Sequence, residues 1–154
     1  MSKFNVRVYG ILLNDKKQVL VSDEYIRGKY YTKFPGGGLE FGEGTRACLQ
    51  REFKEEMNLE VSIKDHIYTT DIFQMSAFTQ DHQIIAIYYF AKAMQPITAP
   101  IRTTAFDFDE QQLERYKQNQ QIETLRFIDW ENFTADAITL PIDKIVATLL
   151  REKY

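Results

Sequence analysis

The chain has 154 residues and a formal net charge of −3, with 44% hydrophobic and 27% charged residues. Length and composition are those of one compact globular domain, so we expect a single domain over residues 1–154. The weak negative charge excludes a strongly basic surface, so a nucleic acid partner is not expected. The one cysteine, Cys48, excludes an internal disulfide and a Cys-rich zinc site.

No segment has the apolar length of a signal peptide or of a membrane-spanning helix. The N-terminal stretch MSKFNVRVYG, in particular, lacks an apolar run. We therefore expect a cytoplasmic protein with no membrane partner.

The first quarter of the chain predicts a pair of strands followed by a loop. Val6 to Leu13 has the apolar density of a buried strand, and Gln18 to Ser22 is predicted to return beside it as a hairpin after a turn at residues 14–17. Residues 23–33 are predicted to form a loop rich in aromatic and basic side chains. The following PGGG, residues 35–38, is expected to interrupt regular structure.

A helix is predicted from Arg46 to Met57, with Thr45 as its N-cap residue. Leu49, Phe53 and Met57 recur every four residues and give this helix an apolar stripe. Asn58 is predicted to end it, because asparagine tolerates the left-handed conformation of a helix C-cap.

The remainder predicts three more strands and a closing helix. Residues 61–67 and Gln83 to Met94 read as two strands, and Thr124 to Asp129 reads as another. Residues 95–122 are less regular and are expected to form a short helix or a loop. A helix is predicted near Pro141 by its apolar period. This mixture predicts a mixed sheet covered by helices.

Three carboxylates, Glu52, Glu55 and Glu56, lie around one side of the first predicted helix. Like charges at these spacings repel by about 0.2–0.5 kcal/mol per pair. A bound Mg²⁺ would remove this repulsion, because it takes carboxylate oxygens and bridges to substrate phosphates. Taken alone, however, the segment REFKEE is more typical of a solvated helix face than of a metal site.

The residues before the helix add three features. Gly36, Gly37 and Gly38 would let the backbone approach a ligand closely. Glu43 lies close enough to the helix start to reach the same cluster, and Arg51 could hold a carboxylate by a bidentate contact. Each feature also has an ordinary structural explanation. The spacing of these residues distinguishes a metal site from those explanations.

That spacing resembles the Nudix box, whose family pattern is G-x5-E-x7-R-E-U-x-E-E-x-G-U with U a bulky apolar residue. Gly37, Glu43, Arg51 and the three glutamates match all six polar or glycine positions through Glu56. At a typical frequency of about 7% per residue type, six matches arise by chance about once in ten million windows. Phe53 and Leu59 fill the two apolar positions, and Asn58 stands in place of the last glycine.

The resemblance implies a Nudix fold, an α/β (α+β) structure described as an α/β/α sandwich around a mixed β-sheet. It also implies a metal-dependent hydrolase that cleaves the pyrophosphate bond of a nucleoside diphosphate linked to another group, X. By position, Glu52, Glu55 and Glu56 bind Mg²⁺, or Mn²⁺ as a substitute, and the backbone carbonyl of Gly37 adds a ligand. Glu52, Glu55 and Arg51 are thereby implied as catalytic residues, and Glu43 as a residue that orients them.

Substrate recognition is expected outside the box. Arg27, Tyr31 and Lys33 belong to a basic and aromatic segment that could stack on a base and contact phosphates. The general base is left open between a box glutamate and a later acid. Four later acids are candidates: Asp107, Asp109, Glu110 and Glu123. Glu123 lies directly before the strand predicted from Thr124 and is also a candidate substrate-binding residue.

Other functions remain open at this point. Residues 42–47, GEGTRA, match a weak form of a dinucleotide-binding fingerprint, but the strand before them would be only three residues long. A Nudix-like module that senses a nucleotide or nucleotide sugar without catalysis is the second alternative. A homodimer is also possible, with residues 95–122 as a candidate interface.

Overall fold

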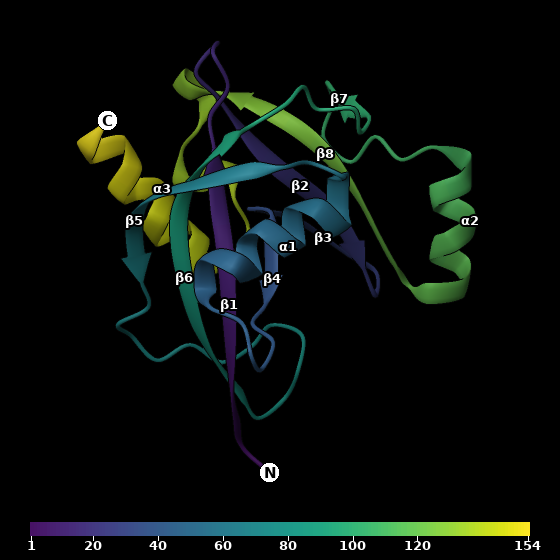
Figure 1. Ribbon diagram of the computed structural model, residues 1–154. Coiled ribbons are helices and arrows are strands. Elements are labelled where there is room, and N and C mark those ends of the chain that lie inside the picture. The colour runs from purple at the N-terminus through teal and green to yellow at the C-terminus, as the bar shows by residue number, and fades with distance from the viewer. The chain divides into compact units, whose positions relative to one another are not determined.

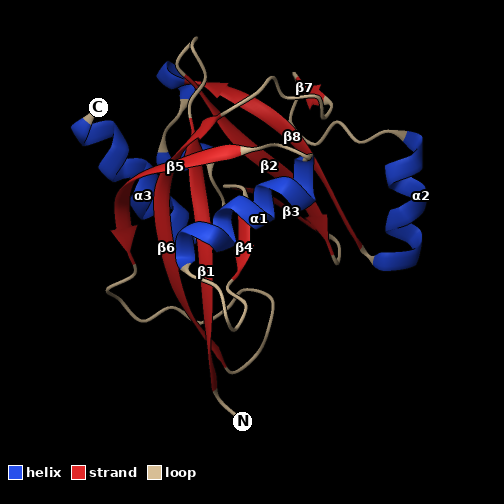
Figure 2. Ribbon diagram, viewed as in Figure 1, coloured by secondary structure: helices blue, strands red, loops and turns tan.

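The computed structural model describes residues 1–154, and the chain divides into two compact units. The first unit holds residues 1–14 and 35–98, and the second holds residues 15–34 and 99–154. Figure 1 labels the elements, and Figure 2 separates the helices from the strands. No helix combines the length and the apolarity that crossing a membrane requires.

The first unit is a four-stranded mixed sheet with one helix, and its strand order is β4-β1-β6-β5. β1 (Lys3–Leu12) is antiparallel to β4 (Gly36–Gly38) and parallel to β6 (His82–Ala93). β5 (Val61–Thr69) pairs antiparallel with β6 at the edge. The helix α1 (Thr45–Met57) joins β4 to β5 and crosses this sheet (Figure 1).

The apolar stripe of α1 explains why the helix lies on this sheet. Leu49 and Phe53 are fully buried, and Met57 is almost so. Gly10 of β1 lets the helix come close, because a Cβ there would lie 2.7 Å from Cε2 of Phe53. The predicted end of the helix is confirmed, since Asn58 is the C-cap residue in the left-handed conformation, with φ 52° and ψ 40°.

The second unit has its own four-stranded mixed sheet, with the order β3-β2-β8-β7. Its strands are β2 (Gln18–Ile26), β3 (Lys29–Lys33), β7 (Ile101–Arg102) and β8 (Gln121–Asp129). Two helices also belong to this unit, α2 (Glu110–Asn119) and α3 (Pro141–Lys153). Two short 3₁₀ turns, Trp130–Asn132 and Ala135–Ala137, lie between β8 and α3.

The mixed α+β fold class is confirmed, but several local predictions are wrong. The first two strands do not form a hairpin, because β1 pairs with β4 and β6 while β2 pairs with β3 and β8. The glycines 36–38 do not interrupt regular structure; they form β4 on β1. A Cβ at Gly36 would lie 2.8 Å from the Cα of Tyr9, so this strand needs glycine to approach β1.

Residues 23–33 are not a loop, because β2 runs on to Ile26 and β3 returns beside it. Four polar residues of this segment, Asp23, Glu24, Thr32 and Lys33, are buried and paired inside the sheet. Asp23 accepts a hydrogen bond from Thr32 Oγ1 at 2.8 Å, and Glu24 pairs with Lys33 at 3.1 Å. These strands are stabilised by polar side-chain pairs across β2 and β3, so they lack the alternation of apolar and polar residues that would predict a strand.

Two further boundaries differ from the predictions. The N-cap residue of α1 is Gly44 rather than Thr45, which is the first residue of the helix. The last strand begins at Gln121 rather than Thr124, so Glu123 lies inside β8. Within residues 95–122 the short helix is the correct alternative, and α2 begins with a capping box formed by Asp109 and Gln112.

Candidate functional site

The candidate site lies in the first unit, where β4, the loop of residues 39–44 and α1 follow one another. β4 holds Gly37 opposite Val8 of β1, and α1 carries Arg51 and the three box glutamates. Because α1 returns past β4, the glycine backbone and the helix side chains meet at one place. All the residues that match the Nudix box therefore belong to one unit.

Gly37 and Glu52 make the closest approach in this site. A Cβ at position 37 would lie 2.6 Å from Glu52 Oε2, and still closer to Cδ and Oε1. The Glu52 carboxylate thus fills the space of the missing side chain, and its side chain is only 14% exposed. A larger residue at position 37 would displace this carboxylate, because it lies against the strand backbone.

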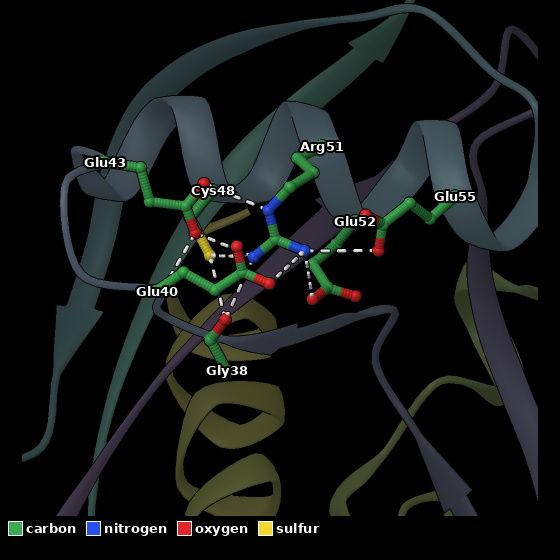
Figure 3. Close-up of polar contacts among 7 residues, drawn as sticks. All are labelled: Gly38, Glu40, Glu43, Cys48, Arg51, Glu52 and Glu55. Atoms are coloured by element: carbon green, nitrogen blue, oxygen red, sulfur yellow. Dashed lines mark hydrogen bonds and ion pairs between the residues drawn. The ribbon is translucent and has the colours of Figure 1, made fainter.

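Arg51 holds Glu43 by two parallel hydrogen bonds (Figure 3). Its Nε donates to Glu43 Oε2 at 3.0 Å, and its Nη2 donates to Glu43 Oε1 at 2.7 Å. Nη2 also donates to the carbonyl oxygen of Gly38 at 3.1 Å. This fork ties α1 to both the loop and β4, which a lysine at position 51 would not do.

The remaining nitrogen of Arg51 faces the other carboxylates. Nη1 donates to Glu52 Oε1 at 3.0 Å and to Glu55 Oε2 at 3.1 Å. Glu40 Oε1 lies 3.6 Å from the same nitrogen. One guanidinium therefore lies at the centre of four carboxylates, as Figure 3 shows.

This arrangement changes the acidity of the groups it joins. The hydrogen bonds from Arg51, with a further one from the Glu40 backbone amide, lower the pKa of Glu43 to about 2. The carboxylate of Glu43 in turn raises the pKa of the Arg51 guanidinium. Both groups stay charged across the pH range in which proteins work.

Cys48 is buried beneath this cluster, with its Sγ 3.5 Å from the Gly38 carbonyl oxygen. Burial raises the pKa of its thiol to about 12, and the carboxylate of Glu43 adds to the shift. The thiol therefore stays protonated, which agrees with a packing role and not with a nucleophile.

The donors of the site suit a hard divalent cation in type, since carboxylate oxygens converge beside a glycine backbone. In the present arrangement no group of three or more His, Cys, Asp or Glu side chains is placed to hold a metal ion. The reason is visible in the contacts: the guanidinium of Arg51 occupies the space between Glu52 and Glu55. Glu56, half-buried, follows Glu55 on α1.

The residues predicted to bind substrate belong to the second unit. Lys33 is 8% exposed and forms an ion pair with Glu24 Oε1 at 3.1 Å, and Ser22 Oγ donates to the other oxygen of Glu24 at 3.0 Å. Tyr31 lies in β3, and Arg27 lies in the turn between β2 and β3 with a positive φ of 48°. Lys33 is thus a buried ion-pair partner rather than a solvated cation.

The candidate general bases are also in the second unit, where they have ordinary structural contacts. Asp109 caps α2 and pairs with Arg102 at 3.2 Å. Glu123 is exposed in β8, and its backbone carbonyl accepts from Gln112 Nε2 at 2.8 Å. Asp107 and Glu110 are exposed at the start of the same helix.

Two residues of the arginine cluster were not predicted from the sequence. Glu40 approaches Arg51, and its backbone N–H donates to Glu43 Oε1 at 3.0 Å. The Gly38 carbonyl oxygen receives Arg51 Nη2. A signal for Glu40 exists in the sequence, because Gly42, with φ 97°, makes a tight turn that brings positions 40 and 43 together.

Comparison of the sequence with family models supports the family that the Nudix box indicates. The model of the family described as NUDIX domain matches residues 3–146. A comparison with curated proteins finds no match.

Solved structures with the same fold match almost the whole chain. A MutT protein from Methanosarcina mazei Go1 is 15% identical with a TM-score of 0.66, and the match covers 98% of this chain and 96% of that one. A UDP-X diphosphatase is 18% identical with a TM-score of 0.63, covering 99% and 63%. An ADP-ribose pyrophosphatase from Streptococcus suis is 10% identical with a TM-score of 0.56, covering 97% and 92%. At these identities the likeness shows the fold.

Proposed function

Because the chain belongs to the NUDIX domain family, we propose that it is a divalent-metal-dependent hydrolase of a nucleoside diphosphate linked to a group X. The bond cleaved is the pyrophosphate bond, so the enzyme is a pyrophosphohydrolase. Structural neighbours include proteins named as a UDP-X diphosphatase and as an ADP-ribose pyrophosphatase, and their names motivate this substrate class. We further infer that residues 1–154 form one Nudix domain and that the protein works in the cytoplasm.

One observation carries the proposal, namely the contact of the Glu52 carboxylate with the backbone of Gly37. A solvated helix face, the alternative for these acids, would leave such a carboxylate in water. Here it is held between Gly37 and Arg51, and carboxylate oxygens are ligands that Mg²⁺ prefers. Residues 42–47 also begin at a turn and enter α1 without a preceding strand, which argues against the dinucleotide fingerprint.

We assign the cation to Glu52, Glu55 and Glu56 with the Gly37 carbonyl, and Mg²⁺ or Mn²⁺ suits these donors. When bound, the cation supplies charge that polarises a phosphoryl oxygen and makes water a stronger nucleophile. It also neutralises the repulsion between carboxylates and substrate phosphates. An acidic protein can therefore accept a polyanion at this site.

The residues of the chain orient the acids for that task. Glu43 fixes Arg51 by two hydrogen bonds, and Arg51 then points Nη1 at both Glu52 and Glu55. Each group holds the next, so Glu52 and Glu55 are restrained, and the Arg51 guanidinium would shift from between them to admit a cation. A box glutamate next to these ligands would accept the proton of the attacking water.

Substrate contacts are assigned to Arg27 and Tyr31, in β3 and the turn before it, whereas the buried Lys33 is held in its ion pair with Glu24. The test is chromatographic identification of the phosphorylated products formed with Mg²⁺ or Mn²⁺ across a panel of nucleotides, because most of these substrates would give two phosphate esters and no free phosphate. The panel includes deoxynucleoside triphosphates, oxidised purine nucleotides, ADP-ribose, nucleotide sugars and dinucleoside polyphosphates. A Glu55→Gln, Glu56→Gln double variant is the control.

Metal-dependent turnover of one class, lost in the double variant, supports the proposal and identifies X. Tight binding of a nucleotide sugar without turnover, with the fold and metal binding intact, would contradict the hydrolase. That result would favour the sensor module.

A further inference from the structure

Tyr89 of β6 is linked to the start of α1 by two different contacts. Its hydroxyl lies 2.7 Å from Oγ1 of Thr45, the first residue of the helix. Its ring lies under the guanidinium of Arg46, with Cζ 4.7 Å from the ring centroid. Tyr89 is only 8% exposed, so both contacts are made at the edge of the core of the first unit.

Arg46 extends this link to the neighbouring strand. Its Nη1 donates to the carbonyl oxygens of Ile63 at 3.0 Å and of Lys64 at 2.9 Å, both in β5. The pairing of β5 with β6 shifts register between Ile63 and His66, so these carbonyls lie at an irregular point of the sheet. The first turn of α1 is therefore fastened to two strands.

The start of α1 has no side-chain cap of its own. The N-cap residue, Gly44, makes no side-chain hydrogen bond, and the first turn carries no acidic residue. The apolar stripe buries one face of the helix, but apolar contacts have little directional preference. A hydroxyl hydrogen bond of 2.7 Å does depend on direction, so it limits sliding and rotation of the helix.

The position of the helix matters because the site tolerates little displacement. Glu52 lies seven residues after Thr45, about 10 Å further along the helix axis. Its carboxylate is already in tight contact with the Gly37 backbone. A small shift of α1 would therefore move Glu52 and Glu55 relative to β4.

We propose that Thr45, Arg46 and Tyr89 form a helix-start clamp that positions α1 and thereby sets the affinity of the box carboxylates for a divalent cation. The clamp residues are positioning residues, since they act through Glu52 and Glu55. This inference rests on the proposed function, because it takes those carboxylates as metal ligands.

The test compares Thr45→Val, Tyr89→Phe and the double variant with the wild-type protein. Thr45→Val and Tyr89→Phe each remove one hydroxyl and keep the shape of the side chain. Tyr68→Phe is the matched control, because Tyr68 also lies in β5 but its hydroxyl donates to Asp71 Oδ1, just after that strand, at 2.6 Å. The readout is the Mn²⁺ dissociation constant, measured by electron paramagnetic resonance at a temperature where every variant is folded.

We expect each single variant to raise the Mn²⁺ dissociation constant about three- to tenfold, below the loss of about 10- to 100-fold that follows removal of a direct partner of a metal ligand. The double variant should show no further loss, because both changes remove the same hydrogen bond. The Tyr68→Phe control should leave the constant unchanged. An Arg46→Lys variant, which keeps the charge over the ring but cannot span both carbonyls, should fall between wild type and Tyr89→Phe.

Unchanged Mn²⁺ affinity in the two single variants would overturn the clamp, as would equal losses in Tyr68→Phe. A Glu52→Gln, Glu55→Gln, Glu56→Gln variant separates this failure from that of the proposed function. If the triple variant loses Mn²⁺ and the single variants do not, only the clamp is wrong. If the triple variant binds Mn²⁺ as wild type does, both proposals are wrong.

Discussion

At the scale of single residues, Gly37 and Gly38 are neighbours in β4 with very different surroundings. A Cβ at Gly37 would meet the Glu52 carboxylate, whereas a Cβ at Gly38 would meet only Arg7 Nη1, at 3.7 Å. Neither glycine has a positive φ, so alanine fits the backbone at both positions. The two substitutions therefore separate the effect on the site from the effect on the strand.

We predict that Gly37→Ala displaces Glu52 and weakens Mn²⁺ binding about 10- to 100-fold, as expected when an ordered metal ligand loses its place. Gly38→Ala should bind Mn²⁺ within about twofold of wild type, since its Cβ meets no carboxylate. Titration of the two purified variants measures this. Equal affinities in both would contradict the role of the Gly37 and Glu52 contact.

The lowered pKa of Glu43 leads to a second prediction at this scale, on the stability of the fold in acid. Its pKa is lowered in the folded protein to about 2 by Arg51 and the Glu40 amide, from an ordinary value of 4.5. Its contribution to stability is thus complete above about pH 4.5 and is lost as the pH falls toward 2. We expect Glu43→Gln to lower the unfolding temperature at pH 6 and to make it less sensitive to acid below pH 4.5.

Thermal unfolding of wild type and Glu43→Gln between pH 2.5 and 7, in the presence of a chelator, measures this difference. Glu114→Gln is a suitable control, because Glu114 forms only an exposed pair with Lys117 on α2. Parallel curves for wild type and Glu43→Gln over the acidic range would show that Arg51 does not hold the Glu43 carboxylate.

At the scale of elements, the end of α1 depends on the conformation of Asn58. Its φ of 52° is costly for residues with a Cβ, less so for asparagine and not for glycine. We predict that Asn58→Ala lowers the free energy of unfolding by about 1 kcal/mol, whereas Asn58→Gly, the residue of the family pattern, does not lower it. Urea unfolding of both variants decides this, and equal losses would contradict it.

The sheet of the second unit depends on one buried carboxylate. Asp23 is fully buried and accepts from Thr32 Oγ1, from the Phe106 amide and from Arg126 Nε and Nη2, at 2.7 to 3.3 Å. These contacts join β2, β3, β8 and the loop that contains Phe106. The network explains how β2 tolerates two adjacent acids, Asp23 and Glu24, in its interior.

We predict that Asp23→Asn costs about 3 kcal/mol of unfolding free energy, because it leaves the charge of Arg126 without its partner. Asp129→Asn is the control, because Asp129 is exposed and receives only Gln18 Nε2 at 2.7 Å. Its expected cost is below about 0.5 kcal/mol. Urea unfolding measures both costs. Similar costs for the two variants would contradict the claim that the buried Asp23 stabilises the sheet more than an exposed carboxylate does.

At the scale of the whole molecule, the sequence predicts the parts that depend on local periodicity and spacing. The stripe of Leu49, Phe53 and Met57 predicts α1, and the spacing of Gly37, Glu43 and Arg51 identifies the family. Neither depends on knowing which strands pair. This is why the helix and its cluster of charges were predicted in detail.

The errors arise where pairing over long distances decides the structure. No local pattern shows that β1 pairs with β6 rather than with β2. The paired residues of β1 and β6 are 79 positions apart in the sequence, as Lys3 and His82 are. Nor does a run of three glycines reveal that it will form a strand, since its partner is the backbone of β1. The buried pairs of Asp23 and Glu24 likewise exist only once β3 and β8 lie beside β2.

The most direct test of the central claim is turnover in water enriched in oxygen-18, with the substrate found in the panel and with Mg²⁺ present. We predict one labelled oxygen in a phosphate-containing product, no label in wild-type reactions with excess chelator, and no turnover in Glu55→Gln, Glu56→Gln. Label in a product that contains no phosphorus, or metal-independent turnover that survives the double substitution, would contradict hydrolysis at phosphorus by this site.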